Sequence, residues 1–375
     1  MFDKIEQKPD KKLLLVILAL TVFGWIMSAS ASVGHFGTFS YALKQGLFIL
    51  LGGVAAVLVL RLPLSFFKKH SLLAFIITLV LLVLVFIPGI GAGKINGAYR
   101  WIDLGLFNFQ PSEMMKLVMI LFMANFLVEE QEHVTKSLKG LFNALFIIAL
   151  SGALTMAETD LGATIIITAT ALIMVFVAGS YVKELLYMGT TILLGLSIFV
   201  YFNPARWDRA ISFWANDLWG KDGVHQTKQA LLGIARGDWF GTGLGSGIQK
   251  YTKLPEPHTD MIFAITGEEL GIVGLLFILF SFVYILTKGF RIAAKASRNG
   301  KKYSYYVAYG ICSWFSMQIS VNIAMNIGLM PIKGFTLPLI SYGGSSMVFT
   351  IIALALLLRI DMENRADYSK RKTYV

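Results

Sequence analysis

The sequence predicts an all-α, polytopic membrane protein with about ten transmembrane helices and one large extracytoplasmic loop. Hydrophobic residues make up 56% of the 375 residues, charged residues only 15%, and the mean hydropathy is +0.68. Soluble domains carry a larger charged fraction. Apolar runs recur along the whole chain, many of them near the ~20 residues that a helix needs to cross the hydrocarbon core. We therefore expect residues 1–375 to form a single membrane domain.

Ten segments are predicted to span the membrane. The first follows Lys8-Pro9-Asp10-Lys11-Lys12 and has the layout of a signal peptide, but its length and the second apolar run close behind favour a retained signal-anchor. An even number of spans places both ends of the chain on one side. The predicted spans are Leu13–Ser30, Ala42–Leu60, Ser71–Ile87, Ser112–Leu127, Gly140–Met156, Leu161–Ala178, Leu185–Tyr201, Met261–Thr287, Ser304–Ile327 and Gly343–Leu358.

Lysine and arginine indicate which side that is. With the N-terminus inside, the outer side apart from the large loop holds only Lys44, Lys94, Arg100, Lys116 and Lys333. The positive-inside rule then places both termini, including a charged tail at about residues 360–375, in the cytoplasm. The protein is expected in the cytoplasmic (inner) membrane. Its net charge of +11 would face anionic lipid, so no nucleic-acid partner is expected.

The single cysteine, Cys312, lies in an apolar run. It can form neither an internal disulfide nor a cysteine metal cluster. Redox chemistry is therefore not expected. No organic cofactor is expected either.

The large loop, about residues 202–260, is the expected working site. Its acidic and basic residues nearly balance, and it contains four of the seven tryptophans, which favours a loop folded against the membrane surface. It ends in Pro255-Glu256-Pro257-His258-Thr259-Asp260, directly before an apolar run. Chemistry in water is most plausible here, because nearly all other segments are membrane helix.

Polar residues also gather at the outer ends of the predicted spans. Pro111 and Ser112 suit a helix start, and Glu113 and Lys116 are spaced to meet on one helix face. With Arg100 nearby, they either form an interfacial ion pair or line the site. The stretch Glu158-Thr159-Asp160 is adequately explained as a tight polar turn between two spans.

Acidic residues follow the end of the loop. If a helix starts at Asp260, Glu268 lies about 12 Å deeper and roughly 80° around it, while Glu269 points to the opposite side. Carboxylates at that depth are unfavourable unless paired, and they usually mark functional positions. The candidate partners are Glu113 with Lys116, and Arg100; we expect Glu113, Lys116 and Glu268 to form one coupled network. For Asp260 itself, the alternative is a helix cap.

The stretch Lys333–Ser346 is predicted to be broken backbone. Its prolines and glycines oppose a continuous helix, and such backbone is tolerated near a membrane where it lines a cavity. Ser341, Gly343, Gly344 and Ser345 would offer N–H groups to a phosphate at the start of the last helix. A re-entrant hinge is an equal alternative. The glycine run at 241–247 is expected to be a flexible loop rather than a nucleotide site.

These stretches together resemble one family over nearly the whole chain. The similarity is to the SEDS family (shape, elongation, division and sporulation), in order and topology, and it rests on Gln110-Pro111-Ser112-Glu113, on Leu254–Ala264 with Glu268–Gly271, and on Pro338–Ser346. The stretch Lys333–Pro338 is more similar to the division members than to the elongation members. One departure is Glu158-Thr159-Asp160, where the family usually shows Gln-Pro-Asp.

The resemblance implies a peptidoglycan glycosyltransferase that polymerises lipid II outside the membrane and releases undecaprenyl diphosphate. Its partners would be lipid II, the undecaprenyl-diphosphate-linked glycan, a class B penicillin-binding protein (transpeptidase) and other divisome proteins. Asp260 is expected to be the general base for the attacking hydroxyl, with His258 close to it. Charge for the leaving diphosphate would come from Arg100, Lys116, Lys333, the broken segment or a divalent cation, Mg²⁺ or Mn²⁺.

Two other functions remain open at this stage. A lipid II flippase would need a polar path across the bilayer. Gln318, Asn322 and Asn326 are the main mid-span polar groups and the charges are concentrated outside, which disfavours a transporter. A non-catalytic scaffold for cell division would need the charged loops but not Asp260.

Overall fold

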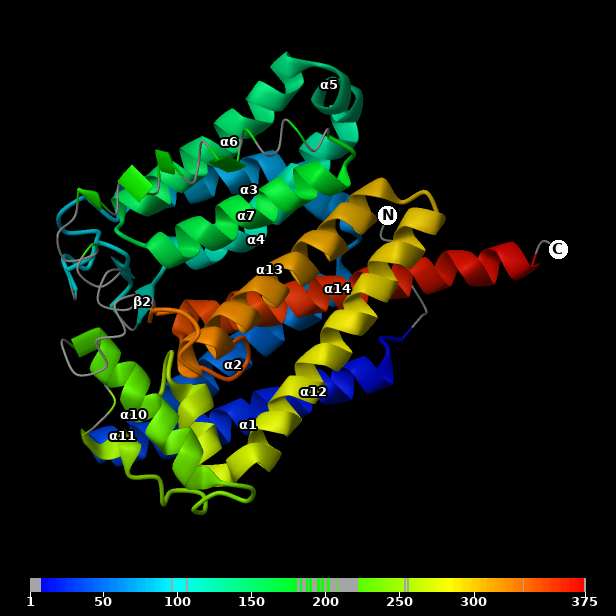
Figure 1. Ribbon diagram of the computed structural model, residues 1–375. Helices are drawn as coiled ribbons and strands as arrows, with labels where there is room; N and C mark the ends of the chain where they lie inside the picture. The colour runs from blue at the N-terminus through cyan, green and yellow to red at the C-terminus, as the bar shows by residue number, and fades with distance from the viewer. Residues whose placement is uncertain are drawn as a thin grey trace.

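The computed structural model describes residues 8–373, except positions 96, 106, 253, 255 and 333 and most positions between 181 and 221. Its described part consists of helices and one two-stranded antiparallel hairpin (Figure 1). The elements are α1 (Lys11–Phe36), α2 (Ser40–Arg61), α3 (Leu64–Leu84), β1 (Ile102–Asp103), β2 (Asn108–Phe109), α4 (Pro111–Glu129), α5 (Gln131–Lys136), α6 (Leu138–Ala157), α7 (Leu161–Val177), α10 (Asp222–Gly237), α11 (Gln249–Thr252), α12 (Ile262–Arg298), α13 (Lys302–Asn326) and α14 (Gly344–Thr373).

The helices confirm an all-α, multi-pass membrane protein. Each predicted span except Leu185–Tyr201 falls on a helix, and that span lies mostly outside the described residues. Within the described part, seven helices are long and apolar enough to cross a membrane, and α7 is a shorter apolar helix. The remaining span, α13, is helical throughout but carries the polar side chains of Gln318, Asn322 and Asn326.

Local sequence signals set several helix ends. Asp10 caps α1 by accepting hydrogen bonds from the backbone N–H groups of Lys12 and Leu13 at 2.9 and 3.1 Å. Asp160 caps α7 in the same way through Ala163 N, at 3.1 Å. Pro111 occupies the first turn of α4, where its missing N–H has no intrahelical partner to lose.

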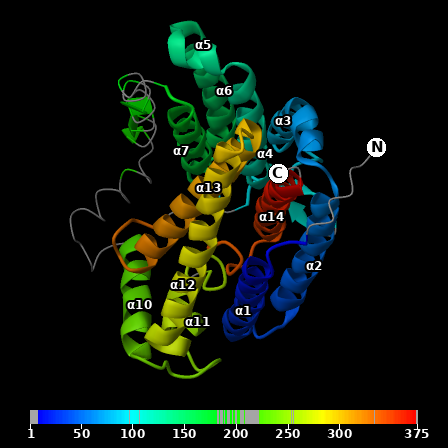
Figure 2. The same cartoon turned by 90° about the vertical axis from the view of Figure 1, so that its right-hand side faces the viewer.

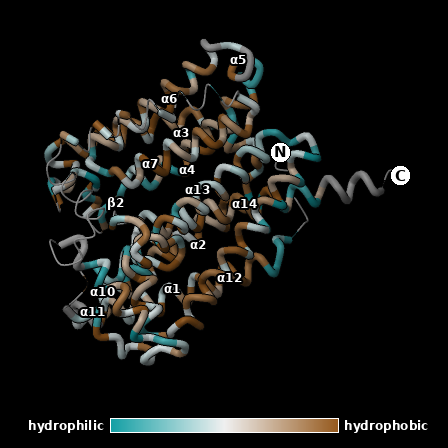
Figure 3. Tube along the Cα trace, viewed as in Figure 1, coloured by the Kyte–Doolittle hydropathy of each residue, from teal (hydrophilic) through white to brown (hydrophobic). Residues whose placement is uncertain are grey.

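The helices form a bundle around α4 and α14. Most of these two helices is buried, whereas α2 and α3 expose much of their apolar surface, as lipid-facing helices do. Helix α14 packs along α2, α3 along α4, and α12 along α13 (Figure 2). Hydrophobic residues line the helix shafts, and hydrophilic residues gather mainly at their ends (Figure 3).

The two ends of the bundle differ. Helix α1 begins, and α14 ends, at one end (Figure 1). The β1–β2 hairpin, α10 and α11 lie at the opposite end, which we call the loop end. The start of α1 and the end of α14 thus lie at the same end of the bundle, which agrees with the predicted even number of spans.

Helix α12 is broken near the loop end. Gly271 has φ 64° and ψ −162°, a backbone conformation that side chains disfavour. The chain at 238–243 fills this break: Thr242 N and Gly243 N donate to the carbonyls of Glu268 and Glu269 at 2.9 and 3.0 Å. The glycine run expected to be a flexible loop is therefore partly fixed by backbone hydrogen bonds to α12.

Candidate active site at the loop end

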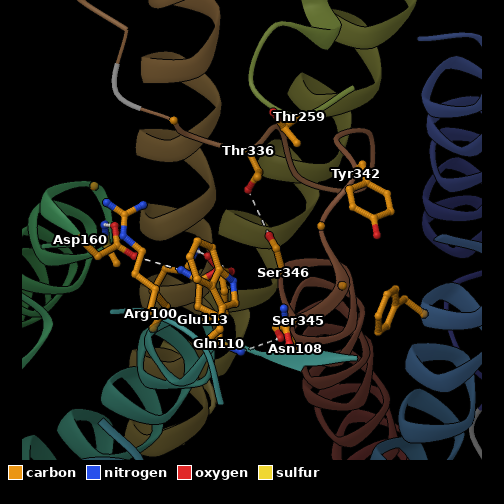
Figure 4. A pocket seen from close by; sticks show the side chains of 18 of the residues that line it. Arg100, Asn108, Gln110, Glu113, Asp160, Thr259, Thr336, Tyr342, Ser345 and Ser346 are labelled. Carbon is orange, nitrogen blue, oxygen red and sulfur yellow. Dashed lines mark hydrogen bonds and ion pairs between the residues drawn. The ribbon is translucent and has the colours of Figure 1, made fainter. Parts of the chain in front are cut away.

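A cavity of about 560 Å³ lies at the loop end, where several elements meet. Its wall is formed by α2, the β1–β2 hairpin, the start of α4, the turn between α6 and α7, Thr259, and the stretch 334–346. Many of the lining side chains are polar. Those labelled in Figure 4 are Arg100, Asn108, Gln110, Glu113, Asp160, Thr259, Thr336, Tyr342, Ser345 and Ser346.

Asp260 adjoins this cavity beside Thr259. Its side chain is half-buried, and its Oδ1 accepts a hydrogen bond from Thr259 Oγ1 at 3.2 Å. Burial raises the pKa of Asp260 to about 6; the nearby Glu256 charge adds to this, while hydrogen bonds from Thr259 and local N–H groups oppose it. Helix α12 starts after Met261, which has no side-chain cap. The carboxyl is therefore available for a role other than capping.

Polar side chains of α13 hold the backbone of Asp260. Asn322 Nδ2 and Asn326 Nδ2 donate to the Asp260 carbonyl at 3.0 and 2.9 Å, and Asn326 Oδ1 accepts from Ala264 N at 3.1 Å. One turn further, Gln318 Nε2 donates to the Thr336 carbonyl at 2.8 Å. The three main mid-span polar residues of α13 thus bind the site segments. Their i, i+4, i+8 spacing was the signal for this role.

The broken segment is fastened to the chain just before Asp260. Ser341 Oγ donates to the Thr259 carbonyl, and Tyr342 N donates to the His258 carbonyl at 2.8 Å. The buried His258 ring packs in a three-ring cluster with Tyr41 and Tyr342, whose ring centroids lie 4.8 and 5.3 Å from it and 5.1 Å from each other. Residues far apart in sequence thus fix the backbone next to Asp260 from three directions.

Gly343 and Gly344 contact α2, so fewer of their N–H groups are free for the phosphate that was expected to bind there. Gly343 N donates to the buried Gln45 Oε1 at 3.3 Å, and Gln45 Nε2 donates to the Ser341 carbonyl at 3.2 Å. A Cβ at Gly344 would lie 2.6 Å from the Phe48 ring. The N–H of Gly343 is therefore already used, and close packing explains the glycine at 344. Sequence reasoning missed Gln45.

Glu113 and Lys116 form the expected ion pair in a buried position at the cavity wall. Lys116 Nζ lies 2.8 and 2.7 Å from the two Glu113 carboxylate oxygens. It also donates to Gln318 Oε1 at 3.3 Å and lies 5.2 Å from the centre of the Trp314 ring. The pair thus both lines the site and connects α4 to α13.

Glu268 does not join that pair, so the expected three-residue network is wrong. Its carboxylate pairs with Arg236 Nη1 at 3.1 Å and accepts from Ile248 N and Gln249 N. Glu269 pairs with the buried Lys250, whose Nζ is 2.5 Å from Oε1. Both carboxylates bind the loop at 238–250. They anchor that loop rather than line the cavity.

The remaining candidates lie around the cavity with unequal roles. Arg100 Nη2 donates to the Thr159 carbonyl at 2.7 Å and lines the wall beside Asp160. Ser345 Oγ accepts from Gln110 N at 2.9 Å. Lys44, which was counted only as an outer lysine, also lines the cavity. Lys333 lies outside the described residues, although its neighbour Gly334 contributes to the wall.

Comparison with known proteins gives the chain clear relatives. "Probable peptidoglycan glycosyltransferase FtsW" of Nitrosococcus halophilus is 39% identical over 374 residues, covering 98% of this chain and 95% of that protein. The protein of the same name from Legionella pneumophila is 38% identical over 364 residues, covering 95% and 91%. These names agree with the similarity to the division members.

Solved structures share the fold. A chain of the structure described as "Structural coordination of polymerization and crosslinking by a peptidoglycan synthase complex" aligns with a TM-score of 0.79 at 23% identity, covering 95% of this chain and 98% of that one. The Thermus thermophilus rod shape determining protein RodA aligns with a TM-score of 0.71 at 24% identity, covering 95% and 97%.

The family described as "Cell cycle protein", named for FtsW, RodA and SpoVE, matches residues 11–366. That match covers the whole bundle from α1 into α14, including the cavity, Asp260 and the broken segment. With these relatives and this fold, the chain belongs to the FtsW/RodA/SpoVE family, the SEDS proteins.

Proposed function

We propose that the chain is a peptidoglycan glycosyltransferase that polymerises lipid II into glycan strands during septal cell-wall synthesis. The names of its relatives support the activity. The observation that carries the proposal is Asp260: a half-buried carboxyl with a pKa of about 6 beside a polar cavity. A carboxyl in that range is ionised at neutral pH and still basic enough to take a proton.

Asp260 would act as the base in glycan extension. The 4-hydroxyl of the GlcNAc unit of lipid II attacks the anomeric carbon of the strand held on undecaprenyl diphosphate. The new C–O bond forms as the bond from that carbon to the diphosphate breaks, and the hydroxyl proton passes to the Asp260 carboxylate. The hydrogen bonds from Asn322 and Asn326 hold the Asp260 backbone in place for this step.

The leaving diphosphate needs positive charge, which the cavity supplies unequally. Lys116 is already paired with Glu113, so its charge is largely compensated. Arg100 donates to a backbone carbonyl, and Lys44 lies 6.0 Å from the centre of the Tyr41 ring. We therefore assign the main diphosphate contacts to Arg100 and Lys44, with Lys333, Ser345 and the start of α14 as further candidates.

A resident divalent cation fits the described residues poorly. They contain no group of three or more potential His, Cys, Asp or Glu ligands. The two carboxylates that line the cavity are already used, Glu113 by Lys116 and Asp160 by Gln110, Ser112 and Ala163. If Mg²⁺ or Mn²⁺ takes part, it would arrive with the diphosphate, as Mg²⁺ commonly does.

The loop end is proposed to face outward and both termini to face the cytoplasm. The lysine and arginine bias supports this orientation. A class B penicillin-binding protein is the proposed partner, because glycan strands must be cross-linked as they are made, and other divisome proteins would place the pair at the septum.

The decisive experiment uses the purified chain in nanodiscs with lipid II, with and without the transpeptidase. We expect glycan ladders from the wild type and a loss of about 10²- to 10⁴-fold in rate for Asp260→Asn, the usual contribution of a general base. Thermal unfolding should show that the variant remains folded. Ladders at the wild-type rate from Asp260→Asn would remove the base assignment. Transport of lipid II without polymerisation would favour the flippase.

A further inference from the structure

Two carboxyl groups with opposite surroundings share the turn between α6 and α7. The Asp160 carboxylate accepts three hydrogen bonds, from Gln110 Nε2, Ser112 Oγ and Ala163 N, at 3.0, 3.1 and 3.1 Å. Glu158 is 0% exposed, and neither of its carboxyl oxygens has a hydrogen-bond partner among the described residues. The Asp160 carboxyl is therefore surrounded by hydrogen-bond donors, whereas the Glu158 carboxyl has none among the described residues.

Elementary electrostatics selects the protonated form of Glu158. An ionised carboxylate buried without donors is strongly unfavourable, and a second negative charge two residues away makes it more so. Burial, followed by the Asp160 charge, raises the pKa of Glu158 to about 9, although Arg100 opposes the shift. Asp160 and Arg100 are the charged groups of the described residues that act on Glu158.

The protonation state of Glu158 affects the guanidinium of Arg100. Its Nη2 donates to the carbonyl of Thr159, the residue between the two carboxyls, and Thr159 is held at φ 62°. Its Nε is buried and has no hydrogen-bond partner among the described residues, which also provide no ion pair for Arg100. An ionised Glu158 would add a second carboxylate near this guanidinium. Arg100 lines the cavity wall near Asp160 (Figure 4), and a neutral Glu158 leaves it without an ion-pair partner among the described residues.

We propose that Glu158 is a positioning residue that works as a neutral carboxylic acid, so that the α6–α7 turn holds Arg100 by a backbone carbonyl and leaves its guanidinium without a carboxylate ion-pair partner, free to bind an anionic, phosphate-bearing ligand. Ionisation of Glu158 at alkaline pH would add a competing negative charge and weaken that ligand's binding. The neutral state of Glu158 is independent of the proposed function, whereas the identity of the ligand that Arg100 binds rests on it.

The protonation state is tested first, on the full chain in nanodiscs. The infrared spectrum of the wild type minus that of Glu158→Gln, near pH 7, should contain the C=O band of a protonated carboxylic acid, and the band should disappear above about pH 9. Glu129→Gln is the matched control, because Glu129 is exposed on the same kind of helix end and should give no such band. A missing Glu158 band at pH 7 would overturn the proposal.

The consequence for Arg100 is tested with lipid II as the probe. In the wild type, KM should rise about fivefold or more between pH 7 and pH 10, a typical effect of a lost charge contact. Ionisation of the substrate affects both proteins equally, so it cancels in the ratio of wild-type KM to Glu158→Gln KM, and this ratio should rise with pH. The corresponding ratio of Arg100→Gln KM to the KM of the Arg100→Gln/Glu158→Gln double variant should not change with pH. A ratio that stays flat with Arg100 intact would refute the positioning role.

Failure of this proposal can be distinguished from failure of the proposed function. If the chain does not polymerise lipid II, the infrared band still decides the protonation state of Glu158. The Kd for inorganic pyrophosphate then replaces KM, measured for the wild type, Glu158→Gln, Arg100→Gln and the double variant at pH 7 and pH 10. The ratio of wild-type Kd to Glu158→Gln Kd should rise with pH only when Arg100 is present; equal Kd values for all four proteins at both pH values would overturn the link to Arg100.

Discussion

Lowering the pH should inactivate the protein by protonating Asp260. Its pKa is raised to about 6, so the carboxylate needed as a base is present above that value and lost as pH falls through it. A group with this pKa is ~90% ionised at pH 7 and ~10% at pH 5, so kcat should fall about tenfold between them. An ordinary exposed aspartate would lose little in this range.

Two substitutions should move the pH at which kcat is half-maximal, the midpoint, in opposite directions. Glu256→Gln removes a negative charge that favours the protonated form, so the midpoint should fall. Thr259→Val removes the hydrogen bond to Oδ1 that favours the carboxylate, so the midpoint should rise. Both partners are partly exposed, so each shift should be roughly half a pH unit. Thr259→Ser keeps the hydroxyl and serves as the control.

The assay is the initial rate of glycan synthesis at saturating lipid II, measured in nanodiscs from about pH 5 to pH 8. Thermal unfolding at each pH separates protonation of the base from loss of fold. The reasoning fails if the wild-type rate has no acid limb near pH 6, or if the Glu256 and Thr259 variants shift the midpoint in the same direction.

Lys250→Met should destabilise the fold by about 3–5 kcal/mol, because it leaves the buried Glu269 carboxylate without its counter-charge. The double variant with Glu269→Gln should lose clearly less in thermal unfolding; strict additivity would contradict this. Gly344→Ala should lower stability by about 1–3 kcal/mol, because its Cβ would overlap the Phe48 ring. Combining it with Phe48→Leu should recover part of that loss, and no recovery would argue against the packing explanation.

Local patterns were enough to predict much of the fold. Long apolar runs predict membrane helices because an isolated helix is the structure that satisfies its own backbone in lipid. Pro111 at the start of α4 and the i, i+3 spacing of Glu113 and Lys116 were read correctly, since both depend on contacts within one turn. The broken backbone before α14 was likewise visible, because proline and glycine act on their own residues.

The partner of Glu268 could not be predicted from local spacing. Helix spacing from Asp260 made Glu113 and Lys116 its candidate neighbours. In the structure, the chain at 236–250 packs against this part of α12, and Arg236 becomes the partner of Glu268. Such packing depends on backbone hydrogen bonds from residues about thirty positions earlier, which no local pattern records.

By itself, the sequence determined the membrane class, the helix positions, the Glu113–Lys116 pair and the choice of Asp260 as the candidate base, because these follow from composition, short-range spacing and motif resemblance. Tertiary structure alone decided how Asp260 is held. Asn322 and Asn326 bind its backbone, Gln45 binds the segment beside it, and Glu158 lies buried near Arg100. The physical reason is that hydrogen bonding, burial and pKa depend on atoms brought together from distant positions, and those distances exist only once the helices have packed.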